Sequence, residues 1–156
     1  MTQPAGGTEH RIVVGVDGSP YSEKALHWAV FLGLTLGARV EAVAAWDYPA
    51  AAGWATPPSD WDPAADSKKI LQDTIHKVFG APPPAILTAD VREGGAARVL
   101  LEASEGAGML VVGSRGHGGF VGLLLGSVSA NVAEHAKCPV LIVHGHQPLP
   151  TLPTPS

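Results

Sequence analysis

The sequence has little of several features that mark particular classes of protein. Its 156 residues include one cysteine, Cys138, which excludes an internal disulfide and is typical of a reducing compartment. No run of Lys or Arg occurs, which argues against a nucleic-acid partner. No apolar stretch reaches the roughly 20 residues of a membrane helix, and residues 1–10 lack a signal-peptide pattern. These absences predict a cytoplasmic protein without a membrane partner.

The chain does have enough apolar residues for a substantial core. Hydrophobic residues make up 46% of the sequence and charged residues 15%, the composition of a globular domain. We expect a flexible leader over residues 1–10, one domain over residues 11–144, and a disordered Pro-rich tail over residues 145–156. The formal net charge of -4 means that local groups must hold any bound polyphosphate.

Apolar runs of strand length alternate with segments of helical spacing. The expected strands are residues 11–17, 39–46, 86–93, 109–113 and 139–143, and the expected helices are residues 20–36, 64–79, 96–106 and 127–136. Continuous apolar runs are typical of strands buried on both faces. The alternation predicts an α/β fold, a Rossmann-like open parallel sheet of five strands with helices on both faces.

The most informative motif lies after the fourth apolar run. Gly113-Ser114-Arg115-Gly116 is followed by nine residues and then by Gly126-Ser127, where a helix is expected to begin. A strand, a glycine-rich loop and a helix in this order present backbone N–H groups and a helix N-terminus to a phosphate. A glycine-rich connection that binds nothing is the alternative.

Each residue of the motif has an expected role. A side chain at Gly113 would block a ligand, and Gly116 permits a turn with positive φ. Gly126 allows the backbone to approach an anion closely. The Ser127 hydroxyl donates to a phosphate oxygen or caps the helix. The loop over residues 120–126 is expected to be mobile or partly helical.

Ligands of open parallel sheets bind beyond the carboxyl ends of the strands, where the strand order reverses. Asp17 ends the first expected strand and Gly113 ends the fourth. If both serve one ligand, those strands are neighbours and the sheet order is 3-2-1-4-5. Asp17 would bind a base, a ribose or a Mg²⁺ ion that accompanies phosphates, or else accept hydrogen bonds locally through Ser19. Arg115 would pair with a phosphate or lie solvated at the surface.

Several catalytic motifs are absent from the sequence. It contains no P-loop lysine motif, no G-x-G-x-x-G after the first strand and no G-x-S-x-G elbow. His144 and His146 alternate like metal ligands but have no further ligand nearby in sequence, and we interpret them as incidental. Cys138 is interpreted as a buried, inert thiol. No catalytic residue is predicted.

The glycine motif, read from Val111 through Ser129, resembles that of the universal stress protein family. The opening Ile12-Val13-Val14-Gly15-Val16-Asp17-Gly18-Ser19 and the ending Cys138-Pro139-Val140-Leu141-Ile142-Val143 look like the same family. The resemblance implies a parallel sheet of order 3-2-1-4-5 that binds ATP, and in some members AMP or cyclic AMP, without efficient catalysis. One departure is Gly108, where the family often has an acidic residue.

The resemblance also implies roles for particular residues. Asp17 and the backbone of Ala45 would contact the adenosine, and Gly113 and Gly116 would line the ribose and phosphates. Backbone and hydroxyl groups of residues 126–129 would donate to the phosphates. The full set of predicted nucleotide contacts is Gly15, Asp17, Ala45, Val112, Gly113, Arg115, Gly116, Gly126, Ser127, Val128 and Ser129.

The family commonly dimerises through its fifth strand, here the strand from Pro139 to Val143, so a homodimer is expected. The leading function is an ATP-binding regulatory stress protein. One alternative is a slow ATPase or nucleotide-transferring enzyme. Another is a nucleotide-free scaffold that binds a protein partner through the aromatic segment from Trp46 to Trp61. In a nucleotide-binding protein, the same segment would instead fold over the nucleotide as a lid.

Overall fold

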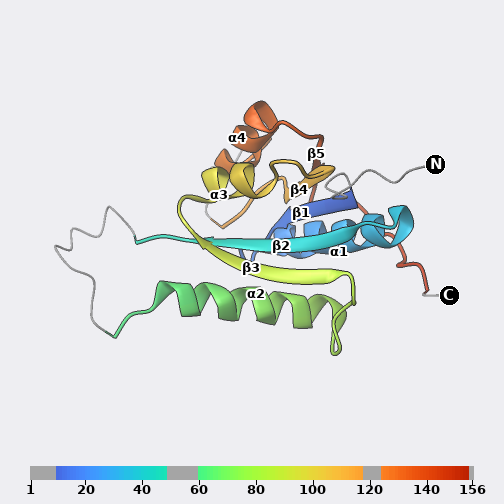
Figure 1. Ribbon diagram of the computed structural model, residues 1–156, viewed down its shortest axis with the longest axis horizontal. Helices are drawn as coiled ribbons and strands as arrows, with labels where there is room; N and C mark the ends of the chain where they lie inside the picture. The colour runs from blue at the N-terminus through green and yellow to red at the C-terminus, as the bar shows by residue number, and fades with distance from the viewer. Residues whose placement is uncertain (1–9, 49–59, 118–123, 155–156) are drawn as a thin grey trace.

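The computed structural model describes residues 10–48, 60–117 and 124–154 (Figure 1). The expected leader lies almost wholly outside the described residues. So do residues 49–59 of the aromatic segment and residues 120–123 of the expected apolar loop. Among the described residues, no helix combines the length and apolarity needed to cross a membrane.

The described elements alternate between strand and helix from β1 to β5. They are β1 (Arg11–Gly15), α1 (Pro20–Leu36), β2 (Arg39–Trp46), α2 (Pro63–Phe79), β3 (Leu87–Glu93), α3 (Ala96–Ala103), β4 (Met109–Gly113), α4 (Ser127–His135) and β5 (Val140–Val143). α3 ends earlier than predicted because successive tight turns follow it. Ala107 N–H donates to Ser104 C=O at 3.0 Å, and Gly106 closes the turn with a φ of 75°.

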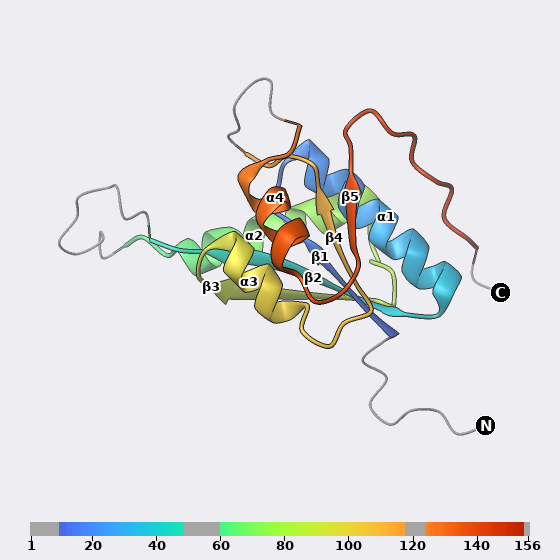
Figure 2. The same cartoon turned by 90° about the horizontal axis from the view of Figure 1, so that it is seen from above.

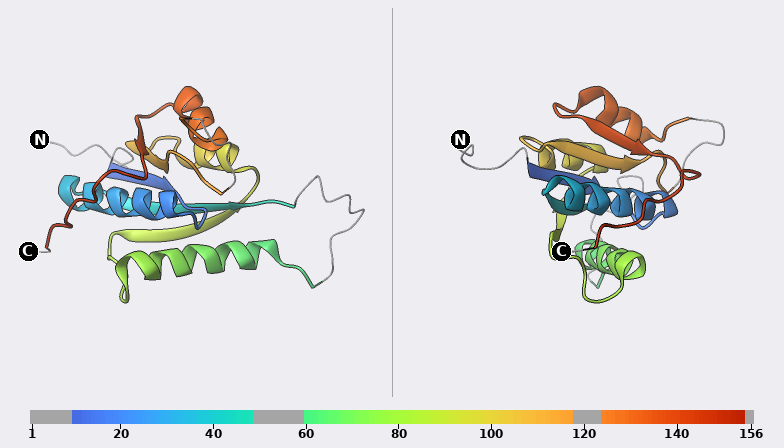
Figure 3. Two further views of the ribbon diagram at one scale, coloured as in Figure 1. Left: turned by 180° about the vertical axis from the view of Figure 1, so that it is seen from behind. Right: turned by 90° about the vertical axis from the view of Figure 1, so that its right-hand side faces the viewer.

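The five strands form one parallel sheet in the order β3-β2-β1-β4-β5, which confirms the predicted fold and order. β1 lies at the centre, with Ile12 opposite Val40 of β2 and Met109 of β4. This register brings the carboxyl ends of β1 and β4 side by side. In Figures 1 and 3, α3 and α4 lie together on the side of the sheet opposite α2.

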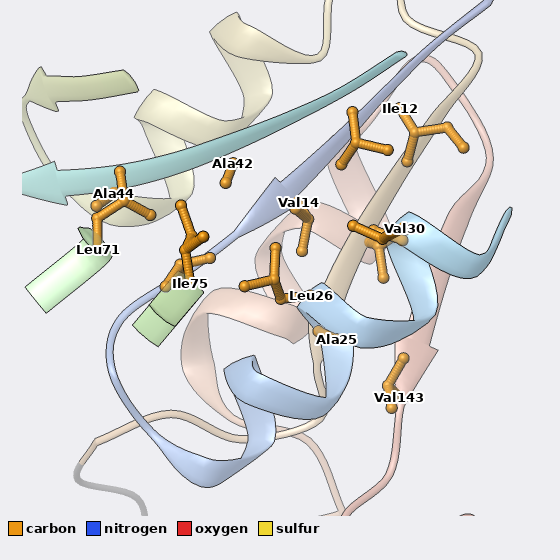
Figure 4. Packing of buried hydrophobic residues seen from close by; sticks show 14 of the residues in the cluster. Ile12, Val14, Ala25, Leu26, Val30, Ala42, Ala44, Leu71, Ile75 and Val143 are labelled. Carbon is orange, nitrogen blue, oxygen red and sulfur yellow. The ribbon is translucent and has the colours of Figure 1, made fainter. Parts of the chain in front are cut away.

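The core consists of two layers, one on each face of the sheet. On one face, α1 and α2 pack on alternate residues of the strands; Figure 4 shows Leu26 and Val30 of α1 with Val14, and Leu71 and Ile75 of α2 near Ala44. On the other face, α3 and α4 pack on the intervening residues through Val99, Leu100 and Val132. Both faces of the sheet are therefore covered, as the continuous apolar runs predict.

Capping side chains fix where α1 and α2 begin. The Ser19 hydroxyl accepts a hydrogen bond from Ser22 N–H at 3.2 Å, and Pro20 is the first helical residue of α1. The Asp62 carboxylate accepts from Ala65 N–H at 3.1 Å at the start of α2. These are the standard devices for satisfying the free N–H groups of a first helical turn.

The chain after β5 turns back alongside α1 (Figure 2). The Lys24 ammonium donates to Gly145 C=O, and the His27 ring nitrogen Nε2 lies 2.6 Å from Pro150 C=O. Leu152 packs against the core layer that contains α1. The division of the chain into leader, domain and tail stays a prediction. No pattern in the sequence indicated that residues after β5 would contact α1 in this way.

We predict that Leu26→Ala lowers the free energy of unfolding by about 2 to 5 kcal/mol, because Leu26 is fully buried and its loss leaves a cavity beneath the central strands. Leu36→Ala on the same helix is the matched control. Its side chain is 59% exposed, so the change should cost about 0.5 kcal/mol or less. Urea denaturation of both variants measures the difference, and equal losses would contradict this account of the core.

Candidate functional site

A cavity opens at the carboxyl edge of the sheet, between the ends of β1 and β4. All the predicted nucleotide contacts line it: Gly15 and Asp17 at the end of β1, Ala45 of β2, Val112, Gly113, Arg115 and Gly116 of β4 and its loop, and Gly126, Ser127, Val128 and Ser129 at the start of α4. Its enclosed volume is about 140 Å³. Typical ligand pockets hold about 300–1,000 Å³. The enclosed part therefore accommodates only a portion of a ligand, and the remainder would lie in the open mouth.

Sequence reasoning missed several residues of this cavity. They are Val16, Ser22, Val43, Ala96, Leu100 and His117. Val43 lies on β2 opposite Gly15, two positions before Ala45, so strand alternation is a signal that could have found it. Ala96 and Leu100 come from α3, whose position over the cavity depends on the crossover from β3 and has no local signature.

The Asp17 carboxylate joins the end of β1 to the glycine loop. Its Oδ1 accepts hydrogen bonds from Ser19 N–H at 2.9 Å and from the Ser19 hydroxyl at 2.5 Å. Its Oδ2 accepts from His117 N–H at 3.1 Å. The local role through Ser19 is therefore present, and the second oxygen ties two segments that are 100 residues apart in sequence.

The charge of Asp17 sets the polarity of the cavity. The residue as a whole is exposed, but its carboxylate is partly shielded. Burial acts to raise the pKa of Asp17, and hydrogen bonds from Ser19, His117 and Ser22 outweigh it, so the pKa is lower than usual. Asp17 is ionised at neutral pH, which disfavours an anionic group directly beside its carboxylate.

The two glycines of the loop both pack closely against other parts of the protein, and the positive φ predicted for Gly116 is wrong. Gly116 does not adopt a positive φ; a Cβ at this position would collide with Asp17 Oδ2. A Cβ at Gly113 would lie 2.7 Å from the Tyr21 Cβ and 2.9 Å from the Tyr21 carbonyl carbon, so it would clash with the first turn of α1. Close approach to other parts of the protein requires both glycines, and the expectation that a side chain at Gly113 would block a ligand stays a prediction, since Gly113 also lines the cavity.

The N-terminus of α4 faces the cavity without a capping side chain. Gly126 occupies the N-cap position, and Ser127 is the first helical residue rather than the cap. Gly126 N–H donates to Ser114 C=O at 2.7 Å, and the buried Ser129 hydroxyl donates to the same oxygen at 2.9 Å, which fixes the helix start against the loop. Among the described helices, α3 also begins without a side-chain cap, and its first residue, Ala96, lines the same cavity.

The cavity contains groups that suit an anion together with groups that suit an uncharged part of a ligand. A helix N-terminus carries free N–H groups and a partial positive charge. Arg115, which is half-buried, adds a full positive charge on the same side. The same cavity is also lined by the ionised Asp17 and by the apolar side chains of Val43 and Leu100.

An open parallel α/β sheet with a glycine-rich loop at its carboxyl edge defines the class of Rossmann-like proteins. The model of the universal stress protein family matches residues 9–144, so the chain belongs to this family. The recognition from the sequence motifs is confirmed.

Individual relatives agree with this assignment. Universal stress protein Rv2623 of Mycobacterium tuberculosis is 36% identical over 133 residues, which cover 84% of this chain and 44% of that protein. A universal stress protein of Mycolicibacterium smegmatis is 33% identical over 155 residues, with 93% of this chain and 51% of that protein covered. The chain thus spans about half the length of these relatives. A crystal structure of a universal stress protein in complex with cAMP has a TM-score of 0.66 and 28% identity, covering 88% of this chain and 98% of the other.

We predict that Asp17→Asn lowers the free energy of unfolding at neutral pH by about 1 to 2 kcal/mol. The amide that replaces one carboxylate oxygen is a donor, so it cannot accept from both Ser19 and His117. Because the folded-state pKa is lower than the unfolded value, the carboxylate stabilises the fold above about pH 4, and this contribution is lost as pH falls through the folded pKa.

Urea unfolding of wild type and variant between pH 7 and pH 2 measures this effect, and the gap between the two proteins should narrow below about pH 4. Asp73→Asn, which removes an exposed carboxylate paired with Lys69 on α2, is the control and should change stability little at any pH. A gap between wild type and Asp17→Asn that is constant with pH would show that the carboxylate does not join the two segments as described.

Proposed function

We propose that this protein is a regulatory adenine-nucleotide-binding protein whose main ligand is ATP. The observation that carries the proposal is the uncapped start of α4, which faces the same cavity as the ends of β1 and β4. Free N–H groups at a helix N-terminus are a common phosphate site in α/β proteins. The crystal structure with cAMP at 28% identity supports an adenine nucleotide as the ligand class, and AMP and cyclic AMP remain the alternatives to ATP.

The charges of the cavity favour one orientation of the nucleotide. The adenosine would lie toward Asp17 and Ala45, where the carboxylate accepts from a ribose hydroxyl or the adenine amino group and where Val43 provides an apolar wall. The phosphates would lie toward Ser127 and Arg115, because the carboxylate of Asp17 repels them. The triphosphate would extend into the open mouth, since the enclosed volume of about 140 Å³ cannot hold the whole ligand.

A Mg²⁺ ion would enter this site only together with the phosphates. The described residues contain no group of three or more His, Cys, Asp or Glu side chains arranged to hold a metal. Both oxygens of Asp17 already accept hydrogen bonds from Ser19 and His117. Mg²⁺ commonly takes one or two carboxylates plus substrate phosphates and waters, so Asp17 would supply at most one of its ligands.

Binding without efficient turnover fits the side chains that line the cavity. In the described part of the chain, the only carboxylate among them is Asp17, whose low pKa makes it a weak general base. The described residues that line the cavity include no lysine to stabilise charge on a transferring phosphoryl group. A slow ATPase is the second candidate, and turnover faster than about 1 per second would favour it.

We predict that Ser127→Pro weakens ATP binding at least about tenfold, because proline removes the first N–H donor of α4. The fold should tolerate the change. Proline is favoured at the first helical position, and Gly126 before it has a φ of -72° and a ψ of 170°, the extended conformation that precedes proline. Calorimetric titration with ATP measures the affinity.

Ser127→Ala is the matched control for this experiment. It removes the hydroxyl and keeps the N–H group, so the difference between the two variants reports on the backbone donor alone. Equal ATP affinity in both variants, with both folded by circular dichroism, would overturn the phosphate site at α4.

We further propose a homodimer formed through β5. Within the described residues, β5 pairs with β4 on one side only. Pro139 C=O and Val143 C=O bond to β4, so by strand alternation the N–H and C=O groups of Val140 and Ile142 point outward from the sheet. An apolar strand edge of this kind is an aggregation hazard unless another chain covers it.

Antiparallel pairing of β5 with a second copy about a two-fold axis would satisfy these groups. We therefore predict a dimer in sedimentation equilibrium at micromolar concentration. Ile142→Pro removes an outward N–H group and should shift the protein to monomer, provided that its circular dichroism stays that of the wild type. Wild-type protein that sediments only as monomer would contradict the proposal.

A further inference from the structure

A second groove lies on the other side of the glycine loop, between the first turn of α1 and the end of β5. We call it the α1–β5 groove, and its polar side chains are Tyr21, Lys24, Ser114, Arg115, His144 and His146. Its volume is about 560 Å³, larger than the enclosed part of the first cavity. Pockets of about 300–1,000 Å³ are the size that binds small molecules.

The groove gathers positive charge in an acidic protein. Lys24 and Arg115 line it together with His144 and His146, and no Asp or Glu is among its described lining residues. The chain as a whole has 14 acidic and 10 basic residues, so this composition is not that of an average surface. The neighbouring Glu23 pairs with Lys77 of α2 at 2.9 Å, which engages its carboxylate away from the groove. The local potential therefore favours an anion although the net charge opposes one.

Contacts that span the length of the sequence fix the far wall of the groove. Residues 144–147 form a turn in which His144 N–H donates to the Gln147 side-chain oxygen at 3.0 Å and Gln147 N–H donates to His144 C=O at 3.2 Å. The Lys24 ammonium donates to Gly145 C=O. Gly145 packs so closely on Tyr21 that a Cβ would lie 2.7 Å from the ring. The turn is held against α1, so the groove is part of the folded structure.

The donors of the groove suit a phosphoryl group. An ammonium has three donors, and Lys24 uses one of them on Gly145 C=O. The rings of His144 and His146 lie with their centroids 6.0 Å apart, and each ring has an N–H group that can donate to an anion. Arg115 lines both this groove and the first cavity. The groove and the first cavity therefore share the loop after β4, which would border the phosphates of the proposed nucleotide.

We propose that the α1–β5 groove binds a small phosphorylated molecule as a second ligand, separate from the nucleotide. Lys24, His144 and His146 bind its phosphoryl group, and Tyr21 forms the wall beside it. The proposal goes beyond the nucleotide site and does not require that ATP occupy the first cavity.

Inorganic pyrophosphate is the probe for this site, and NMR signals of the histidine rings and backbone amides are the readout. We expect saturable shifts of His144, His146 and Gly145 on addition of pyrophosphate, both in ligand-free protein and in protein saturated with ATP. Shifts confined to residues 127–129 would place the anion at α4 and overturn the proposal. Shifts at His144 and His146 that vanish when ATP is bound would assign the groove to the phosphates of the nucleotide itself and would also overturn it.

The two proposals can fail separately in this experiment. If ATP leaves the signals of residues 127–129 unmoved, the nucleotide site is wrong, and the pyrophosphate titration of ligand-free protein still tests the groove. Calorimetry of the same titration in Lys24→Gln combined with His146→Gln should show affinity at least about tenfold lower. Glutamine at position 24 keeps a donor for Gly145 C=O, so the wall of the groove is retained.

The matched control is Lys68→Gln combined with His76→Gln on α2. Both side chains are exposed and outside the groove, and the pair removes the same charges. Its pyrophosphate affinity should equal that of the wild type; an equal loss in both double variants would show non-specific attraction and overturn the site. His146→Gln alone, at an exposed residue, should still weaken binding measurably and keeps the test readable if the first double variant does not fold.

Discussion

The architecture of the site depends on one interaction, the attachment of the Asp17 carboxylate to the loop that follows β4. β1 and β4 are neighbours in the sheet, but their ends come from segments 100 residues apart, and hydrogen bonds from Ser19 and His117 to Asp17 join them. The carboxylate leaves no room for a side chain at Gly116, which explains that glycine better than a backbone preference does. The same carboxylate places a negative charge in the cavity, which disfavours an anionic group beside it.

The described helices differ in how their N-termini are capped. α1 and α2 begin with capping side chains, Ser19 and Asp62, whereas α3 and α4 begin at glycines and line the cavity. Glycine at an N-cap costs only a few tenths of a kcal/mol relative to a capping side chain, so the two uncapped starts are a small cost to the fold. Both lie at the cavity where the proposed ligand would supply oxygens in place of the cap.

The sequence predicted those parts of the fold and of the site that depend on neighbouring residues or on the order of the strands. Continuous apolar runs predicted the parallel sheet, and the assumption that Asp17 and Gly113 serve one site predicted the strand order. The close packing of Gly113 on Tyr21 was not predictable, because Tyr21 belongs to the start of a different element, α1. His144 and His146 were interpreted as incidental for the same reason, since the fold brings them to one groove with Lys24, about 120 residues earlier.

Arg115 lies between the cavity at the start of α4 and the α1–β5 groove. Arg115 follows the buried Ser114, whose carbonyl accepts hydrogen bonds from Gly126 N–H and from the Ser129 hydroxyl. These bonds fix the backbone before Arg115 between β4 and α4. From that position Arg115 lines the first cavity on one side and the α1–β5 groove on the other. In a chain with net charge -4, an anion is held by local groups or not at all. Because Arg115 lines both cavities, the loop after β4 is the shared border of the two proposed anion sites, and its cation is one of the local groups available to each.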